Sequence, residues 1–173
     1  MTRKPLTKDL GPKYGINKHD IIEYDGHKLY GITALRDFGD VKSGQAGGYI
    51  EDGKNLSHEG NCWIYPGAMV FEDALVFGCA KVKDHAIVRG KAFLCGNCEV
   101  SGEAIVTERA NIRGYAKICQ SATVYGTALV EGHSIVDGTA HVSDWVQVRG
   151  KSKIGGAANV NGRTIINGTA VVT

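Results

Sequence analysis

Small and aliphatic residues alternate from Cys62 to Val172 with a period of six. In each hexad an aliphatic residue stands two places after a small one, and glycine commonly follows two places later, as in Ala86, Val88 and Gly90. An α-helix cannot keep this register on one face, because six residues turn it by about 600°. Period-two alternation closed by a glycine instead predicts a short strand and a turn, repeated along the chain.

Hexapeptide periodicity is typical of a parallel β-helix, in which each repeat is buried by its neighbours. The array resembles the hexapeptide-repeat family, where an aliphatic residue is followed four positions later by a small one, as Ile64 is by Ala68. The resemblance implies an all-β, left-handed, three-sided parallel β-helix with three hexads per coil. Residues 61–173 would then form about six coils.

The residues before the array predict a lead-in and a cap. Residues 1–20 are basic and turn-prone, which indicates a partly ordered lead-in. Residues 21–30 predict a hairpin with a type I′ turn at Asp25 and Gly26. Residues 31–60 are glycine-rich and show no hexad register, so we expect an irregular segment that completes a cap over residues 21–60.

The first coil indicates what this cap covers. Six of its outward positions are apolar, and left in water they would form an unusually large patch. We expect the cap to cover them and to close the N-terminal edge of the solenoid. These positions are Trp63, Tyr65, Met69, Phe71, Leu75 and Phe77.

A narrower resemblance concerns residues 32–38, 40–44, 47–51, 55–57 and 60–63. They are similar to the leader of phage and prophage hexapeptide-repeat proteins, a group related to YdcK-type proteins that are often described as acyltransferases on the basis of the fold. The resemblance implies a phage-associated context and supplies no catalytic residue.

Composition and charge limit the classes of partner that this protein could bind. The net charge of +2 is too balanced for nucleic-acid binding by bulk electrostatics. No apolar run is long enough to span a membrane and no apolar signal segment follows Met1, so we expect a cytoplasmic protein in a bacterial host or phage-infected cell.

The five cysteines predict reduced thiols. The hexad register places Cys62 and Cys98 inside as compact hydrophobes, and Cys79, Cys95 and Cys119 outside. We expect no metal site and no resident cofactor, because no spacing in the sequence matches a metal-binding or phosphate-binding motif.

If a coil contains eighteen residues, side chains eighteen positions apart stack at about 4.8 Å. Two outward columns then alternate in charge, as cross-strand neighbours prefer. One contains Lys81, Glu99 and Lys117, and the other contains Arg113, Glu131 and Arg149. Such columns favour a salt-bridge ladder that holds the register.

The second column has an alternative interpretation as a ligand site. Arg113 and Arg149 would bind the ligand together with the neighbouring Tyr115, His133 and Lys151. One version of this hypothesis is sequestration of a nucleotide.

Outward apolar residues beyond the first coil predict self-association. The resemblance implies a homotrimer whose prisms pack side by side around a threefold axis, with clefts between them. The candidate interface residues are Ile87, Phe93, Ile105, Leu129 and Ile165.

One pair of residues could carry chemistry. His85 stacks one coil from Glu103, and a carboxylate beside an imidazole can orient it as an acyl-transfer base. The family's acetyltransferases use a histidine in the cleft between subunits, with acyl-CoA along the prism, so acyl-CoA is expected only under this alternative. An ordinary polar surface is the other interpretation of the two residues.

Three functions are therefore open. The first is a non-catalytic, phage-associated trimer that holds a protein partner or a small ligand, such as a nucleotide, at its faces or clefts. The second is a CoA-dependent acyltransferase with His85 as general base, and the third is a structural protein that stacks through its C-terminal coil. Residues 61–172 contain no inserted loop that could build a pocket, which favours the first.

Overall fold

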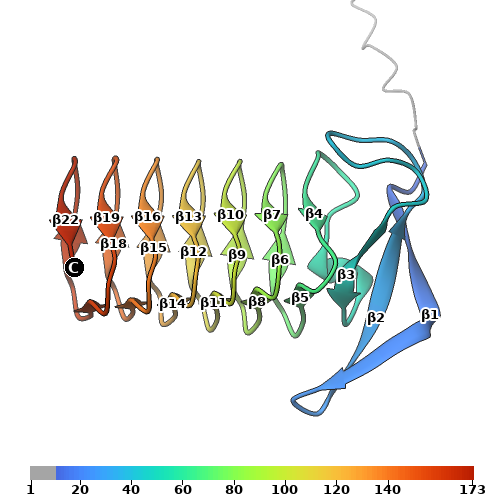
Figure 1. Cartoon of the computed structure of the whole chain (residues 1–173), viewed down its shortest axis with the longest axis horizontal. Coiled ribbons are helices and arrows are strands. Elements are labelled where there is room, and N and C mark those ends of the chain that lie inside the picture. Colours follow the sequence, from blue (N-terminus) through green and yellow to red (C-terminus); the bar gives the residue numbers. More distant parts are fainter. Residues whose placement is uncertain (1–10) are drawn as a thin grey trace, which may run out of the picture.

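The computed structural model describes residues 11–173, in which the hexads wind into a three-sided parallel β-solenoid (Figure 1). Each hexad contributes a two-residue strand and a turn. Face 1 contains β5 (Met69–Val70), β8 (Ile87–Val88), β11 (Ile105–Val106), β14 (Thr123–Val124), β17 (His141–Val142) and β20 (Asn159–Val160). Face 2 contains β6 (Leu75–Val76), β9 (Phe93–Leu94), β12 (Asn111–Ile112), β15 (Leu129–Val130), β18 (Gln147–Val148) and β21 (Ile165–Ile166). Face 3 contains β4 (Trp63–Ile64), β7 (Lys81–Val82), β10 (Glu99–Val100), β13 (Lys117–Ile118), β16 (Ile135–Val136), β19 (Lys153–Ile154) and β22 (Val171–Val172).

The coils stack in the predicted register of eighteen residues. Ile87 lies opposite Ile105, which in turn lies opposite Thr123. The amide of Ile105 donates to the carbonyl of Ala122 in the next coil at 2.9 Å. The parallel, all-β solenoid expected from the hexads is therefore confirmed.

The core consists of inward columns. In the coil that contains β11, both Ala104 and Val106 are fully buried, and the equivalent hydrophobic residues as far as Ile154 join them in one continuous core cluster, whereas Ala158 and Val160 in the last coil are only partly buried. Small residues at the corners and aliphatic residues on the faces fill the triangular interior. The side chains at the outward positions contact solvent and are the ones available to bind a partner.

A long hairpin crosses the N-terminal end of the solenoid (Figure 1). It consists of β1 (Tyr14–Tyr24) and β2 (His27–Ala34), paired antiparallel. Asp25 and Gly26 have φ of 51° and 80°, which a type I′ turn requires, so the predicted turn is confirmed. The hairpin is longer than predicted, because Tyr14 already pairs with Ala34 and a register shift between Asn17 and Ile21 keeps both halves paired. The lead-in expected over residues 1–20 is thus strand from Tyr14 onward, and residues 1–10 lie outside the described part.

The prediction that residues 31–60 lack hexad register is wrong for part of that segment. β3 (Ala46–Ile50) pairs parallel with β5, so that Ile50 lies opposite Val70. After the 3₁₀ turn η1 (Gly53–Asn55), Leu56 bridges Val76. Ile50 and Leu56 are six residues apart and fully buried, and both are displaced by twenty residues from their partners. The leader therefore forms a partial coil on top of the first complete one.

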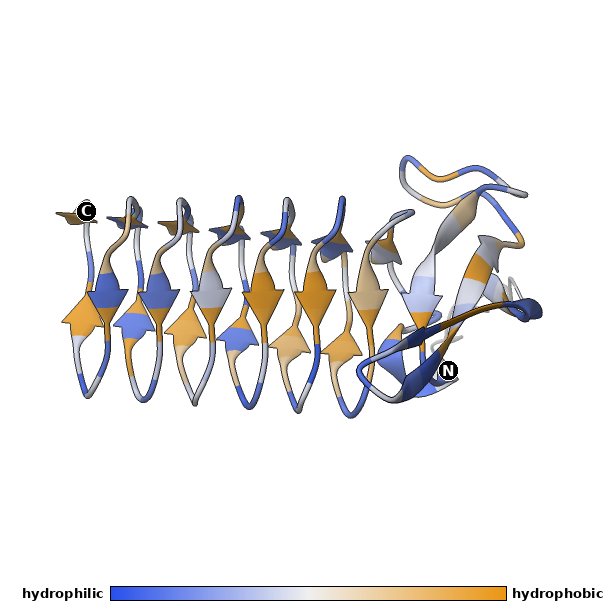
Figure 2. Ribbon diagram, turned by 60° about the horizontal axis from the view of Figure 1, so that its bottom comes forward, coloured by the Kyte–Doolittle hydropathy of each residue, from blue (hydrophilic) through white to orange (hydrophobic). Residues whose placement is uncertain are grey.

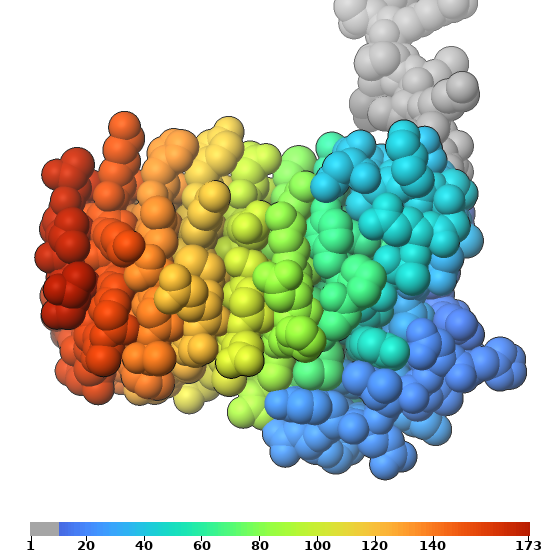
Figure 3. All heavy atoms as spheres, in the orientation of Figure 1, coloured from blue at the N-terminus to red at the C-terminus, as the bar shows by residue number. Residues whose placement is uncertain are grey.

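The cap covers part of the apolar first coil: of the six predicted residues, Tyr65, Met69, Leu75 and Phe77 remain partly exposed. Trp63 and Phe71 are fully buried. The rings of Tyr14 and Phe38 lie 6.3 and 5.3 Å from that of Trp63, while His27 lies 5.2 Å from Phe71. Figure 3 shows the leader as a continuous mass over this end, with the coils following as layers. Within residues 11–173, no helix has the length and hydropathy needed to cross a membrane.

Candidate functional site

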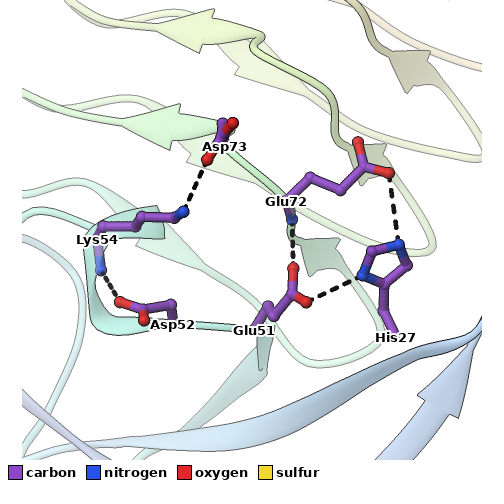
Figure 4. A pocket seen from close by; sticks show the side chains of 6 residues that line it. All are labelled: His27, Glu51, Asp52, Lys54, Glu72 and Asp73. Atoms are coloured by element: carbon purple, nitrogen blue, oxygen red, sulfur yellow. Dashed lines mark hydrogen bonds and ion pairs between the residues drawn. The ribbon is translucent and has the colours of Figure 1, made fainter.

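A polar hollow of about 360 Å³ lies where the cap meets the first coil (Figure 4). The start of β2, the end of β3, the turn η1 and the corner after β5 all contribute to it. Its lining residues are His27, Glu51, Asp52, Lys54, Glu72 and Asp73.

The imidazole of His27 lies between two carboxylates. Its Nδ1 is 2.9 Å from Glu51 Oε1, and its Nε2 is 3.5 Å from Glu72 Oε1. The other oxygen of Glu51 accepts from the backbone amide of Glu72 at 2.7 Å. The bond to Glu51, with further attraction from Glu72 and Asp25, raises the pKa of His27. This arrangement favours the protonated ring, which suits a clamp between cap and coil better than a general base.

Two further ion pairs hold the cap at this corner. Lys54 Nζ lies 2.7 Å from Asp73, and Arg89 Nη1 lies 2.6 Å from Asp25 in the hairpin turn. The hydrogen bond from Lys54 lowers the pKa of Asp73. His27 is not among the residues predicted from the sequence to form a site, because no periodicity relates a hairpin residue to a corner of the solenoid.

A second polar hollow, of about 420 Å³, lies beside the loop between β2 and β3. Asp40 accepts from Lys81 Nζ at 2.9 and 3.0 Å and from the Tyr65 hydroxyl at 2.8 Å. These bonds, that of Lys81 foremost, lower the pKa of Asp40 to about 2. The lining residues are Gly39, Asp40, Asn61, Cys79, Lys81, Asn97, Cys98 and Glu99.

These contacts correct the first predicted ladder. Lys81 pairs with Asp40 of the loop, and Glu99 pairs with Lys83 at 2.7 Å. The described ion pairs do not include one between Glu99 and either Lys81 or Lys117. The cap supplies a carboxylate that the eighteen-residue register could not reveal.

The second predicted ladder is formed. Glu131 Oε2 lies 2.6 Å from Arg113 Nη2, and Glu131 Oε1 lies 3.0 Å from Arg149 Nε. The carboxylate of Glu131 thus pairs with two guanidinium groups, one from the coil before it and one from the coil after it. The favoured interpretation of this column, a ladder of salt bridges, therefore describes its geometry, and its alternative role as a ligand site stays a prediction.

Beside the ladder stand the other predicted ligand residues. The rings of Tyr115 and His133 are stacked, with centroids 4.8 Å apart and planes at 3°. Lys151 is exposed in the next coil and forms no ion pair within residues 11–173. We call this corner between faces 2 and 3 the cationic ridge, and its residues are Arg113, Tyr115, Glu131, His133, Arg149 and Lys151.

The predicted catalytic pair is not bonded. His85 and Glu103 are both exposed at one corner, in adjacent coils. Glu103 accepts instead from the Ser121 hydroxyl at 3.4 Å. Among the described contacts, none joins His85 to Glu103, so a catalytic role for this pair stays a prediction.

The predicted interface residues lie on two faces. Ile87 and Ile105 are neighbours on face 1, whereas Phe93, Leu129 and Ile165 lie on face 2. Figure 2 shows face 1 changing from hydrophobic strands near the cap to hydrophilic β17 and β20 farther away. A trimer interface through these residues stays a prediction.

The thiols match the expected placement. Cys62 and Cys98 are buried, the other three are partly exposed, and all five are free. Burial raises the pKa of Cys98 to about 12, which keeps it a protonated, unreactive thiol. Among residues 11–173, no group of three or more His, Cys, Asp or Glu side chains is arranged to bind a metal ion.

Comparison with known proteins gives one partial relative. Over 65 residues the chain is 40% identical to "Uncharacterized acetyltransferase YdcK" of Escherichia coli (strain K12). The match covers 38% of this chain and 18% of that protein, so it spans less than a fifth of the relative's length. No protein-family model matches the chain. The similarity and the β-solenoid both fit an acyltransferase-like group of hexapeptide-repeat proteins.

Proposed function

We propose that this protein is a non-catalytic binding scaffold whose cationic ridge holds a phosphate-bearing small ligand. The observation that carries the proposal is the fixed arrangement at that corner, where Glu131 orients Arg113 and Arg149 beside the Tyr115–His133 stack. Donors that are already positioned lose less side-chain freedom when a ligand binds.

Charge supports an anionic ligand. The ridge contains three cationic side chains and one carboxylate, and Tyr115 is 55% exposed. Arginine donors match phosphate oxygens, and Lys151 adds a charge that no described ion pair neutralises. The ligand would contact the outer edges of the stacked rings, because each ring covers one face of the other.

The surroundings of the ridge favour binding over catalysis. The described histidines outside the ridge offer no assembled base, since His85 does not contact Glu103 and His27 is held at both nitrogens. The phage-associated context and the threefold assembly implied by the resemblance belong to this proposal.

Calorimetric titration with inorganic tripolyphosphate tests the ridge, because this probe has no ring that could bind elsewhere by stacking. Lys151→Gln is expected to weaken binding about tenfold, the effect of losing one charge-assisted contact of about 1.4 kcal/mol. Arg109→Gln, which removes an equally exposed cation from another corner, is the matched control and should leave affinity unchanged. Absence of binding at low salt, or equal losses in both variants, would contradict the proposal.

Acetyl transfer is the second candidate, and the similarity to YdcK favours it. It would use acetyl-CoA, with His85 as base and Glu103 as its orienting partner once a substrate is bound. Acetyl-CoA binding and turnover by the full chain, lost in His85→Ala and retained in His141→Ala, would replace the binding proposal with this one.

A further inference from the structure

A third hollow lies on face 2 at the edge that borders face 1, whereas the cationic ridge lies at the edge that borders face 3. It has a volume of about 350 Å³ and is lined by Trp145, Gln147, Arg163 and Ile165. β18 and β21 pair so that Gln147 lies opposite Ile165. Trp145 and Arg163 each stand two residues before these positions, so the four side chains come from two adjacent coils.

The hollow has an apolar surface that water reaches. Trp145 is 60% exposed and Ile165 is 63% exposed, whereas Trp63 is completely buried. An exposed indole offers a flat apolar face and one N–H donor. Such a surface suits a flat ring, and stacking on tryptophan does not depend on the ring's identity.

Among the described residues, the hollow contains one cationic side chain, Arg163. Arg163 forms no ion pair within residues 11–173. The carboxylate of Asp144, which precedes Trp145, lies beside this rim but accepts from the backbone amide of Gly162 at 2.9 Å and, among the described ion pairs, is not paired with the guanidinium of Arg163. Lys91 and Arg109 stand in the same column as Arg163 but in more distant coils, and Glu108 and Asp144 stand in the column beside it. The cation that a ligand in the hollow would meet is therefore Arg163 alone.

We propose that this hollow binds a small anion that carries a flat ring, with the ring on Trp145 and Ile165 and the anionic group on Arg163. A nucleoside monophosphate is the simplest biological ligand of this class. The Gln147 amide lies opposite Ile165, at the far side of the hollow from Arg163, and can donate to the ring. This site is independent of the cationic ridge.

The protein carries its own reporter for the test, because it has only two tryptophans and one of them is buried. Adenosine 5′-monophosphate is titrated into the full chain while tryptophan emission is followed. Trp145→Phe, which leaves only Trp63, supplies the correction for absorption by the probe. Adenosine provides the ring without the charge, and inorganic phosphate provides the charge without the ring.

The proposal predicts a saturable change in tryptophan emission with adenosine monophosphate. Adenosine alone and inorganic phosphate alone should each bind at least about tenfold more weakly. Arg163→Gln should weaken monophosphate binding about tenfold and leave adenosine unaffected, since it removes one charge-assisted contact. Arg109→Gln, in the same column, and Lys151→Gln, on the ridge, should change nothing. The Lys151 variant separates failure of this site from failure of the ridge.

Four results would overturn the site. They are the absence of a saturable change, equal binding of adenosine and its monophosphate, equal loss in the Arg163 and Arg109 variants, and emission that shifts with protein concentration as sedimentation reveals association. The last would show that a second copy of the chain covers Trp145.

Discussion

At the scale of single residues, the most unusual feature is a buried lysine in the cap. Lys13 is completely buried, with Nζ donating to the Cys62 carbonyl at 2.8 Å and lying 3.2 Å from the Cys62 sulfur. The amine also lies 5.1 Å from the centre of the Phe38 ring. Burial lowers the pKa of Lys13, with the nearby thiol of Cys62 acting in the opposite direction. The side chain thus fills the end of the core and satisfies a carbonyl there.

Shortening this side chain is expected to destabilise the protein in two steps. Lys13→Met keeps most of the volume but leaves the Cys62 carbonyl without its donor, which costs about 1–3 kcal/mol. Lys13→Ala adds a cavity and should cost at least about 2 kcal/mol more. Urea unfolding measures both changes, and Lys18→Ala on the exposed part of β1 is the neutral control. A Lys13→Ala variant as stable as the Lys18 variant would show that the amine is not buried in this way.

His27 predicts a dependence of stability on pH. Its pKa in the folded protein is raised above the ordinary 6.5, mainly by the bond to Glu51. The clamp therefore contributes fully below pH 6.5, and its contribution is lost as the pH rises through the higher folded pKa. The melting temperature of His27→Gln should be lower than that of the parent protein at acidic pH, and the difference should shrink toward alkaline pH.

His141→Gln is the control for this series, because His141 is exposed on face 1. A deficit of His27→Gln that grows with rising pH would reverse the sign and rule out the ionic clamp. The groups that set the sign are Glu51, Glu72 and Asp25, while Arg89 is paired with Asp25.

At the scale of elements, the corners determine how closely the coils can stack. Glu108 occupies the left-handed region with φ of 58°, and its carboxylate accepts from the amide of Gly126 in the next coil at 3.0 Å. A Cβ on Gly126 would lie 2.5 Å from the amide nitrogen of Asp144 in the coil after that. Acidic residues and glycines therefore alternate along this column. Each carboxylate accepts a hydrogen bond from the backbone amide of the glycine in the next coil.

Two glycines of this column allow the cost of a left-handed backbone to be measured apart from the cost of a steric clash between coils. Both Gly126 and Gly162 have positive φ, but a Cβ at Gly162 would meet nothing within 4 Å. Gly162→Ala should cost about 1–2 kcal/mol, the cost of the left-handed conformation. Gly126→Ala should cost clearly more in urea unfolding, because backbone of the adjacent coil must also move. Equal costs would show that the coils are not packed at this distance.

The hexads predicted most of this architecture. Residues such as Ala104 and Val106 have side chains whose size and spacing determine which way they face, so columns and register followed from the pattern. The partial coil at Ile50 and Leu56 escaped prediction, because a single six-residue step with Lys54 at the second small position and no glycine two places after either residue does not stand out as a repeat.

The candidate sites also include contacts that the repeat predicts and contacts that it does not. The ladder around Glu131 follows from the eighteen-residue register, and so does the Tyr115–His133 stack. The contacts of His27 and Asp40 join the cap to the coils through long-range packing, and no local pattern in the sequence encodes it. Lys81 pairs with Asp40 of the loop between β2 and β3 and not with Glu99 of the next coil, so a residue outside the repeat determines this contact.

At the scale of the whole molecule, the fold separates stability from function. Inward columns and the cap provide most of the packing that holds the solenoid together, while outward side chains add exposed ion pairs, such as those of Lys81 and Arg89 with the cap. The proposed ridge and the hollow at Trp145 both lie on this outer surface. A substitution that changes an outward residue should therefore alter binding and leave the fold intact.

Unfolding of two neighbouring variants tests this separation most directly. Ala104 is completely buried and Glu103, the residue before it, is exposed. Ala104→Arg places an unpaired charge in the core and should cost several kcal/mol, about 3–5 or more, enough to unfold a marginally stable domain. Glu103→Arg should change the free energy of unfolding by no more than about 0.5 kcal/mol. Similar stabilities for the two variants in urea, or a less stable Glu103→Arg, would contradict the account.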